Sequence, residues 1–179
     1  MAPSTSRFPG WHPAFGLFAY ILVLAFFFAK VEIQIEGGQG WAAGLPTWRV
    51  EQHWLLDIFW GGRPMTGYHA WVFSFMALVF HLPPVLMGGW SLALEARILG
   101  SLMYFWTIED FLWFLLNPAY GWAKFTPADI PWHKHWALGV PWDYLTFSVI
   151  GFGLLVWSYL PRGTGQSPGN GPGQAPPQS

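Results

Sequence analysis

The sequence contains no cysteine, and this absence removes several kinds of site at the outset. Disulfide bonds, catalysis by a thiolate, zinc ribbons and iron–sulfur clusters held by thiolates all require cysteine. Any metal ion in this protein must therefore be held by histidine and carboxylate side chains.

Charged residues are also scarce, at 9% of the 179 residues. The 8 Lys and Arg form no basic block that could follow a phosphate backbone, so we expect no nucleic-acid partner. By contrast, 53% of the residues are hydrophobic, which is well outside the usage of soluble proteins. The composition predicts an integral, multi-pass protein of the cell membrane, with membrane lipid as its surroundings.

Four charge-poor runs predict transmembrane helices, because about 20 apolar residues cross a bilayer. The runs cover about 14–31, 69–92, 98–116 and 140–160. We therefore expect an all-α integral membrane fold, a four-span helical bundle formed by residues 1–160. A cleaved signal peptide is the alternative for the first run, but its apolar stretch is long for one and we expect it to be retained. Residues 161–179 lack the apolar side chains needed to offset ordering entropy, which predicts a disordered C-terminal tail.

The segment 31–68 differs in character from the spans around it. It contains Gly and Pro as well as alternating acids near its start, so it is not expected to span. Residues 50–60 carry a helical apolar stripe, but about 11 residues rise only ~16 Å, half a bilayer. We expect this Trp-rich segment to be interfacial or re-entrant.

Tryptophan is abundant, with 14 residues, and Trp favours membrane interfaces because its ring is apolar while its N–H needs a polar partner. Four spans place the connections 31–68 and 117–139 on one side of the membrane, which we call the Trp-rich face. That face carries seven of the tryptophans: Trp41, Trp48, Trp54, Trp60, Trp122, Trp132 and Trp136. With His69 at its edge, it also holds most of the histidines and acids, so we expect the functional site there.

An acid pair, Glu109 and Asp110, lies inside the third predicted span. An acid at the centre of a span costs on the order of 2.5–3.5 kcal/mol, so both residues need partners or a purpose. On a helix Glu109 shares a face with Trp106 and Trp113, whereas Asp110 points about 100° away. We interpret Glu109, Asp110 and His133 as candidate catalytic residues, with Glu109 as a proton acceptor or metal ligand at the floor of a cavity. The alternative is a buried pair that fixes the packing of the spans.

The remaining candidate ligands are Glu51, His53, His69 and His135, which supply the nitrogen and oxygen atoms suited to zinc or non-haem iron. None of them forms a specific motif such as H-E-x-x-H. The alternative is a set of interfacial histidines hydrogen-bonded among the tryptophans. His81 lies in the other half of the membrane, where a helix-packing role is expected.

The stretch IEDFLWFLLNP, residues 108–118, resembles the acid-pair and aromatic motif of the small membrane carotenoid cyclases. That motif has a Pro, any residue, two acids and then aromatic residues, and here Thr107 stands at the Pro position. The likeness covers about ten residues, and the HKHW loop has no counterpart in it. The resemblance implies proton chemistry on an apolar polyene.

Three functions remain open from the sequence. The leading hypothesis is a membrane-embedded enzyme that acts on a lipophilic small molecule at the Trp-rich face, by acid–base or His–carboxylate metal chemistry. The second is a non-catalytic membrane subunit, or a homo-oligomer, whose Trp-rich face binds a partner membrane protein, pigment or lipid. The third is a proton-coupled transporter, which is disfavoured because four spans leave little room for alternating access and no inverted repeat is visible.

Overall fold

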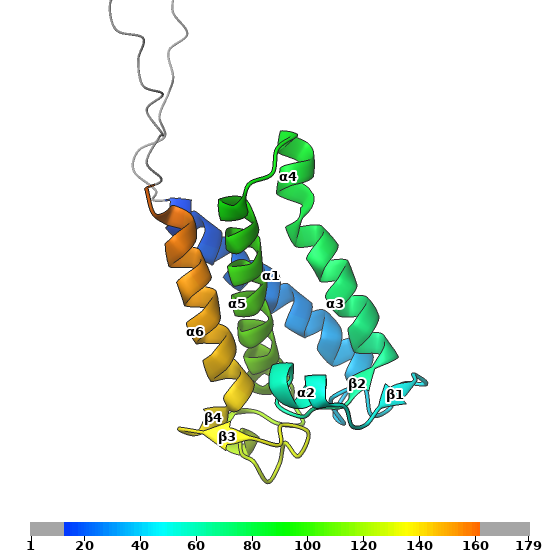
Figure 1. Cartoon of the computed structure of the whole chain (residues 1–179). Coiled ribbons are helices and arrows are strands. Elements are labelled where there is room, and N and C mark those ends of the chain that lie inside the picture. The colour runs from blue at the N-terminus through cyan, green and yellow to red at the C-terminus, as the bar shows by residue number, and fades with distance from the viewer. Residues whose placement is uncertain (1–12, 162–179) are drawn as a thin grey trace, which may run out of the picture.

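The computed structural model describes residues 13–161, and most of this chain is helical (Figure 1). The helices are α1 (Pro13–Glu36), α2 (Trp54–Phe59), α3 (Gly67–Phe80), α4 (Leu82–Met87), α5 (Leu92–Leu116), the short 3-10 helix η1 (Trp122–Lys124) and α6 (Trp142–Tyr159). Two antiparallel pairs of very short strands join β1 (Arg49–Val50) to β2 (Met65–Thr66) and β3 (Trp136–Ala137) to β4 (Val140–Pro141). The predicted tail, from residue 162 onward, lies outside the described residues.

Three helical segments are long and apolar enough to cross a membrane. They are Pro13–Glu36, the α3–α4 segment Gly67–Met87, and Leu92–Leu116. The expectation of a helical membrane protein is therefore supported for three of the four predicted spans. The remaining segment forms α6, a helix of 18 residues that packs along α5.

Helix α5 is the centre of the bundle, with α1 against one side and α6 against another (Figure 1). A first apolar core joins α1, α3 and α5 through Ile21, Ala25, Met76, Phe80, Ile98 and Phe105. The crossing of α5 and α6 is close because glycine faces glycine there. A Cβ atom added to Gly100 would lie 2.8 Å from the carbonyl oxygen of Gly151.

The connections that form the Trp-rich face all gather at one end of the bundle (Figure 1). Helix α5 ends at Leu116, as expected for an Asn117–Pro118 pair, since the residue before proline disfavours the α conformation. The Asn117 side-chain amide donates to the carbonyl oxygen of Gly37 at 2.9 Å. This bond ties the end of α5 to the end of α1, so the connections after both helices start from one place.

Three elements differ in length from the sequence-based prediction. Helix α5 begins at Leu92 rather than near residue 98, because Ser91 caps its start by accepting the Leu94 N–H. Helix α1 was expected to end near residue 31 but continues to Glu36, because no glycine or proline interrupts it before Gly37, whose φ is +67°. Helix α2 covers only Trp54–Phe59 rather than the whole of 50–60, because the His53 imidazole accepts the Leu55 N–H and caps its start. The longer α1 has the greatest consequence, since it places two further acids on a helix inside the bundle.

Candidate functional site

A cavity of about 130 Å³ lies at the end of the bundle nearest the Trp-rich face. Its walls are formed by α1, α3, α5 and α6 together with the connections at this end of the bundle. Its polar lining consists of Glu32, Glu36, Arg63, His69, Glu109, Asp110, Asp143 and Tyr144. The rest of the lining is mainly aromatic: Trp41, Trp60, Phe73, Trp106, Trp113, Phe114, Trp132 and Phe147. The polar residues divide into two clusters with different electrostatics.

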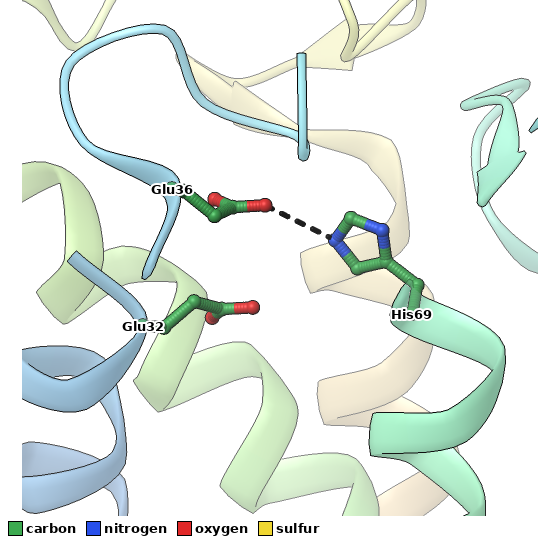
Figure 2. Close-up of side chains that lie close together, drawn as sticks. All are labelled: Glu32, Glu36 and His69. Carbon is green, nitrogen blue, oxygen red and sulfur yellow. Dashed lines mark ion pairs between the residues drawn. The ribbon is translucent and has the colours of Figure 1, made fainter. Parts of the chain in front are cut away.

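The first group, the carboxylate cluster, consists of Glu32, Glu36, His69 and Glu109. Each of Glu32, Glu36 and His69 offers one ligand atom, and these atoms lie within 4.8 Å of one another. Figure 2 shows the two carboxyl groups of α1 facing the imidazole, with Oε1 of Glu36 3.6 Å from Nε2 of His69. All four side chains are buried, and Glu109 is only 2% exposed.

The His69 ring is held from two sides. Thr66 caps the start of α3, and its Oγ1 lies 2.7 Å from Nδ1 of His69 while also accepting the His69 backbone N–H at 3.2 Å. The Trp41 ring stacks on the imidazole with 3.8 Å between ring centroids. This arrangement engages Nδ1 and directs Nε2 toward the carboxyl groups.

The Glu36 carboxyl is held by the loop that follows α1. Its Oε1 accepts the backbone N–H of Ala42 at 2.5 Å. The loop reaches this position through residues of positive φ, including Gly40 at +65° and Ala42 at +52°. Left-handed backbone is unfavourable for a non-glycine residue, so the surrounding contacts must hold Ala42 there.

Glu109 has the least compensated position in the cavity. Its carboxyl group interacts with that of Glu32, and its Oε1 has no N–H or O–H donor within residues 13–161. Within the same residues, no Lys or Arg lies within 4 Å of the carboxyl oxygens of Glu32, Glu36 or Glu109. These acids therefore need either protons or a bound cation to offset their mutual repulsion.

The second group, the ion-pair cluster, consists of Arg63, Asp110, His133, Asp143 and Tyr144. Arg63 pairs with both aspartates, with Nη1 3.5 Å from Oδ1 of Asp110 and Nη2 bonded to Asp143. The His133 ring lies between the same two acids, with Nε2 3.1 Å from Asp110 and Nδ1 3.3 Å from Asp143. The Tyr144 hydroxyl donates to Asp110 at 2.5 Å.

In the ion-pair cluster, a buried guanidinium lies between two acids. Burial by itself would lower the pKa of Arg63, but Asp143 and Asp110 outweigh it and raise the pKa above its usual value. Arg63 is therefore a fixed cation.

The structure brings together only part of the predicted site. Glu109, Asp110, His69 and His133 meet at or beside the cavity, although they come from α5, α3 and the loop before β3. Three other predicted metal ligands are exposed and do not line it: Glu51, His53 and His135. His81 lies at the break between α3 and α4, with its Nε2 3.2 Å from Glu95.

Four charged residues of the cavity were missed by the sequence analysis: Glu32, Glu36, Arg63 and Asp143. The first two carried a usable signal, since acids four residues apart share one face of a helix. Arg63 and Asp143 carried none, because each lies in or next to a connection and meets its partners only through the tertiary fold.

The arrangement places acids that can exchange protons or hold a cation against an aromatic wall that can accommodate an apolar molecule. Phe73 links the two regions, since its ring centroid lies 5.7 Å from that of His69 and 4.7 Å from that of Trp106. No protein-family model, curated protein or solved structure matches the chain. A function can therefore be inferred only from the cavity.

Proposed function

We propose that this protein crosses the membrane four times and is an enzyme that acts on a lipophilic substrate by acid–base chemistry in the cavity. The observation that carries the proposal is the position of Glu109. Its carboxyl is 2% exposed, has another carboxyl beside it, and shares a cavity with a wall of aromatic rings. Intramembrane acids are functional by default, because burying them without a purpose is costly.

The fourth span in this proposal is α6. Its 18 residues rise about 27 Å, close to the ~30 Å of a bilayer core, and its only charged residue is Asp143 in the first turn. Helix α2 and the strand pairs would then lie at the membrane interface. The alternative for α6 is a helix that packs on α5 without crossing.

Single cysteines in this cysteine-free chain test the topology. Cysteines at Gln39 and Ala128 should react with a membrane-impermeant maleimide from one side, and cysteines at Gly89 and Ser167 from the other. If the Ser167 position is labelled from the same side as Ala128, α6 does not cross and the four-span proposal is wrong. The cysteine-free parent controls for background labelling.

In the proposed reaction Glu109 gives or takes the proton. Contact with the Glu32 carboxyl disfavours two adjacent negative charges, so the pair favours holding one proton between them. The aromatic rings of Phe73, Trp106 and Phe147 would seat the apolar part of the substrate next to that proton. Such a site needs no water-filled path from the aqueous phase, because a lipophilic molecule can enter from the bilayer.

The test compares the wild type with Glu109→Gln, which keeps the shape of the side chain but cannot transfer a proton. Both proteins are produced in the same host, and both the lipids bound to the purified protein and the total membrane lipids are profiled by mass spectrometry. We expect a product that depends on the wild type, and an unreacted lipophile bound to Glu109→Gln. Glu95→Gln, at the far end of the bundle, is the matched control. Identical lipid profiles for wild type and Glu109→Gln would contradict the enzyme proposal.

A non-catalytic binding subunit is the second candidate. It is favoured by exposed tryptophans on the Trp-rich face, where Trp48, Trp54 and Trp122 are 54%, 63% and 69% exposed. Exposed aromatic residues of this kind suit both a membrane interface and a protein interface. This candidate predicts that the same lipid, pigment or partner protein purifies with the wild type and with Glu109→Gln, and native mass spectrometry would identify it along with any homo-oligomer.

A further inference from the structure

We infer that the carboxylate cluster is a metal centre in which Glu32, Glu36 and His69, with Glu109 as fourth ligand, bind one Mn²⁺, Fe²⁺ or Zn²⁺ ion. The inference adds a cofactor to the proposed function but rests on the geometry and charge of the cluster. Its test measures bound metal directly, so its failure would leave the acid–base proposal standing.

The distances within the cluster fit one ion. Metal bonds to imidazole nitrogen and carboxylate oxygen are about 2.0–2.2 Å long, which places neighbouring ligand atoms about 3–4 Å apart. The Glu36 and His69 atoms are already 3.6 Å apart, and the ligand atoms of Glu32, Glu36 and His69 all lie within 4.8 Å of each other. Small rotations of the two Glu side chains would therefore complete the coordination without moving a helix.

The His69 ring is oriented as a metal ligand requires. A ligating histidine usually donates its other ring N–H to an oxygen acceptor, which fixes the ring and leaves a lone pair for the metal. Here the Thr66 hydroxyl oxygen is 2.7 Å from Nδ1 and is positioned to accept that proton. Nε2 then carries the lone pair that is available to a metal ion, and it faces Glu36. The Trp41 ring stacked on the imidazole limits its rotation.

A cation also resolves the charge imbalance. The three glutamates are buried together, and within residues 13–161 the cavity's one guanidinium, that of Arg63, pairs with Asp110 and Asp143. Oε1 of Glu109 is buried, lines the cavity and has no donor among those residues. A carboxylate oxygen in this position has the open lone pairs of a metal ligand. A divalent ion would neutralise two of the three charges and leave one proton for Glu109 or Glu32.

The donor set selects the class of metal. One imidazole with several carboxylates suits Mn²⁺, Fe²⁺ and Zn²⁺, whereas Ca²⁺ and Mg²⁺ prefer oxygen ligands alone. A second histidine–glutamate pair, His81 with Glu95, is two residues only and partly exposed. That pair serves as an internal control, because it has the same residue types without the third and fourth ligands.

The experiment is metal analysis of the full chain in detergent, first as purified and then after reconstitution with Mn²⁺, Fe²⁺ or Zn²⁺ and removal of excess ion. Elemental mass spectrometry should find about one ion per chain in the wild type for at least one of the three metals. Glu36→Gln and His69→Gln should each lower affinity by at least about tenfold, and Glu109→Gln by less, as the removal of a fourth ligand would. His81→Gln and Glu95→Gln should bind as the wild type does.

A second readout does not depend on any variant. The wild type loaded with Co²⁺ should show visible d–d absorption with the intensity of a low-coordinate site, and Zn²⁺ should abolish it by competition. Fewer than about one ion per ten chains for all three metals, with no Co²⁺ spectrum, would overturn the inference. So would metal that stays bound in both Glu36→Gln and His69→Gln, because the ion would then sit elsewhere. Glu36→Gln is isosteric and removes a repulsive charge, so its folded state is not expected to be lost.

Discussion

The two polar clusters in the cavity contain similar side chains but differ in how their charges are arranged. In the ion-pair cluster, two aspartates are paired with Arg63 and flank His133. In the carboxylate cluster, three glutamates lie around one histidine: Glu32, Glu36 and Glu109. No Lys or Arg within residues 13–161 pairs with them. Arg63 is a cation between the acids of the first cluster, whereas the second has no such cation among the described residues and requires protons or a metal ion.

This difference separates architecture from function in one cavity. The ion-pair cluster joins four parts of the chain: the loop before β2, helix α5, the loop before β3 and the start of α6. A buried ion pair of this kind is costly to break. The carboxylate cluster joins α1, α3 and α5, and its unmet electrostatic need is what a functional site supplies. Stability should therefore depend on the first cluster and ligand binding on the second.

The largest expected effect is that of Arg63→Ala, which removes the cation from between two buried aspartates. Breaking a buried pair by removing one partner costs about 3–5 kcal/mol, because the remaining charges lose their compensation. A comparable fall in the free energy of unfolding should appear in detergent-mixture titrations. Arg97→Ala is the control, since Arg97 bonds to Ser158 and packs on a tyrosine but pairs with no acid among residues 13–161. An equal loss for both variants would show that the ion pairs are not special.

The second prediction is a difference in sign between two matched amide substitutions. Asp143→Asn should cost about 2–3 kcal/mol, because Arg63 and His133 each lose a charged partner. Glu36→Gln should leave the metal-free protein as stable as the wild type or more stable, because it removes one of three adjacent acids that cannot all be ionised together. Thermal unfolding in the presence of a chelator measures both. If Glu36→Gln destabilises as Asp143→Asn does, the carboxylate cluster is structural.

The sequence predicted the parts of this comparison that depend on helix periodicity. The burial of Glu109 and Trp113 followed from their positions on one face of an apolar helix, and they are 2% and 3% exposed. The break between α3 and α4 falls at His81, directly before a helix whose first turn contains Pro83 and Pro84. These features are local, so a short stretch of sequence contains the information that sets them.

The division of the acids between two clusters was not predictable in the same way. Asp110 meets Arg63 and His133, which are 47 and 23 positions away along the chain, only through the tertiary fold. Glu32 and Glu36 were placed outside the first span because alternating acids usually mark its end, yet their helix continues. Their burial is tolerated because Glu109 and His69 approach them from other helices, which a single segment cannot reveal.

The third prediction separates the clusters mechanically. Gly100→Ala adds a Cβ atom 2.8 Å from a backbone oxygen of α6, so α5 and α6 must move apart. We expect the free energy of unfolding to fall by about 2 kcal/mol, which is in the range measured for overpacked cores. The ion pairs between α5 and α6 should also weaken. Metal content should be unchanged, since the ligands lie on α1, α3 and the opposite face of α5. Gly153→Ala is the control, because nothing lies within 4 Å of its added Cβ. Loss of metal in Gly100→Ala would mean that the clusters are coupled.

The smallest predicted effect is that of Tyr144→Phe, which removes one hydrogen bond from the ion-pair cluster and leaves every charge in place. The Tyr144 hydroxyl donates to Asp110 at 2.5 Å, and a hydrogen bond to a charged group is worth about 1.5–3 kcal/mol. Arg63 and His133 would still compensate Asp110, so we expect a loss near the lower limit, about 1.5 kcal/mol. Tyr104→Phe is the matched control, since that hydroxyl joins the same two helices through a neutral bond of 3.3 Å to the Ser148 carbonyl oxygen. Tyr104→Phe should lower the free energy of unfolding by about 0.5 kcal/mol, the low end for a neutral hydrogen bond. Unfolding titration measures both variants. Equal losses of unfolding free energy would indicate that Asp110 carries no charge, and the ion pair assigned to Asp110 and Arg63 would then be wrong.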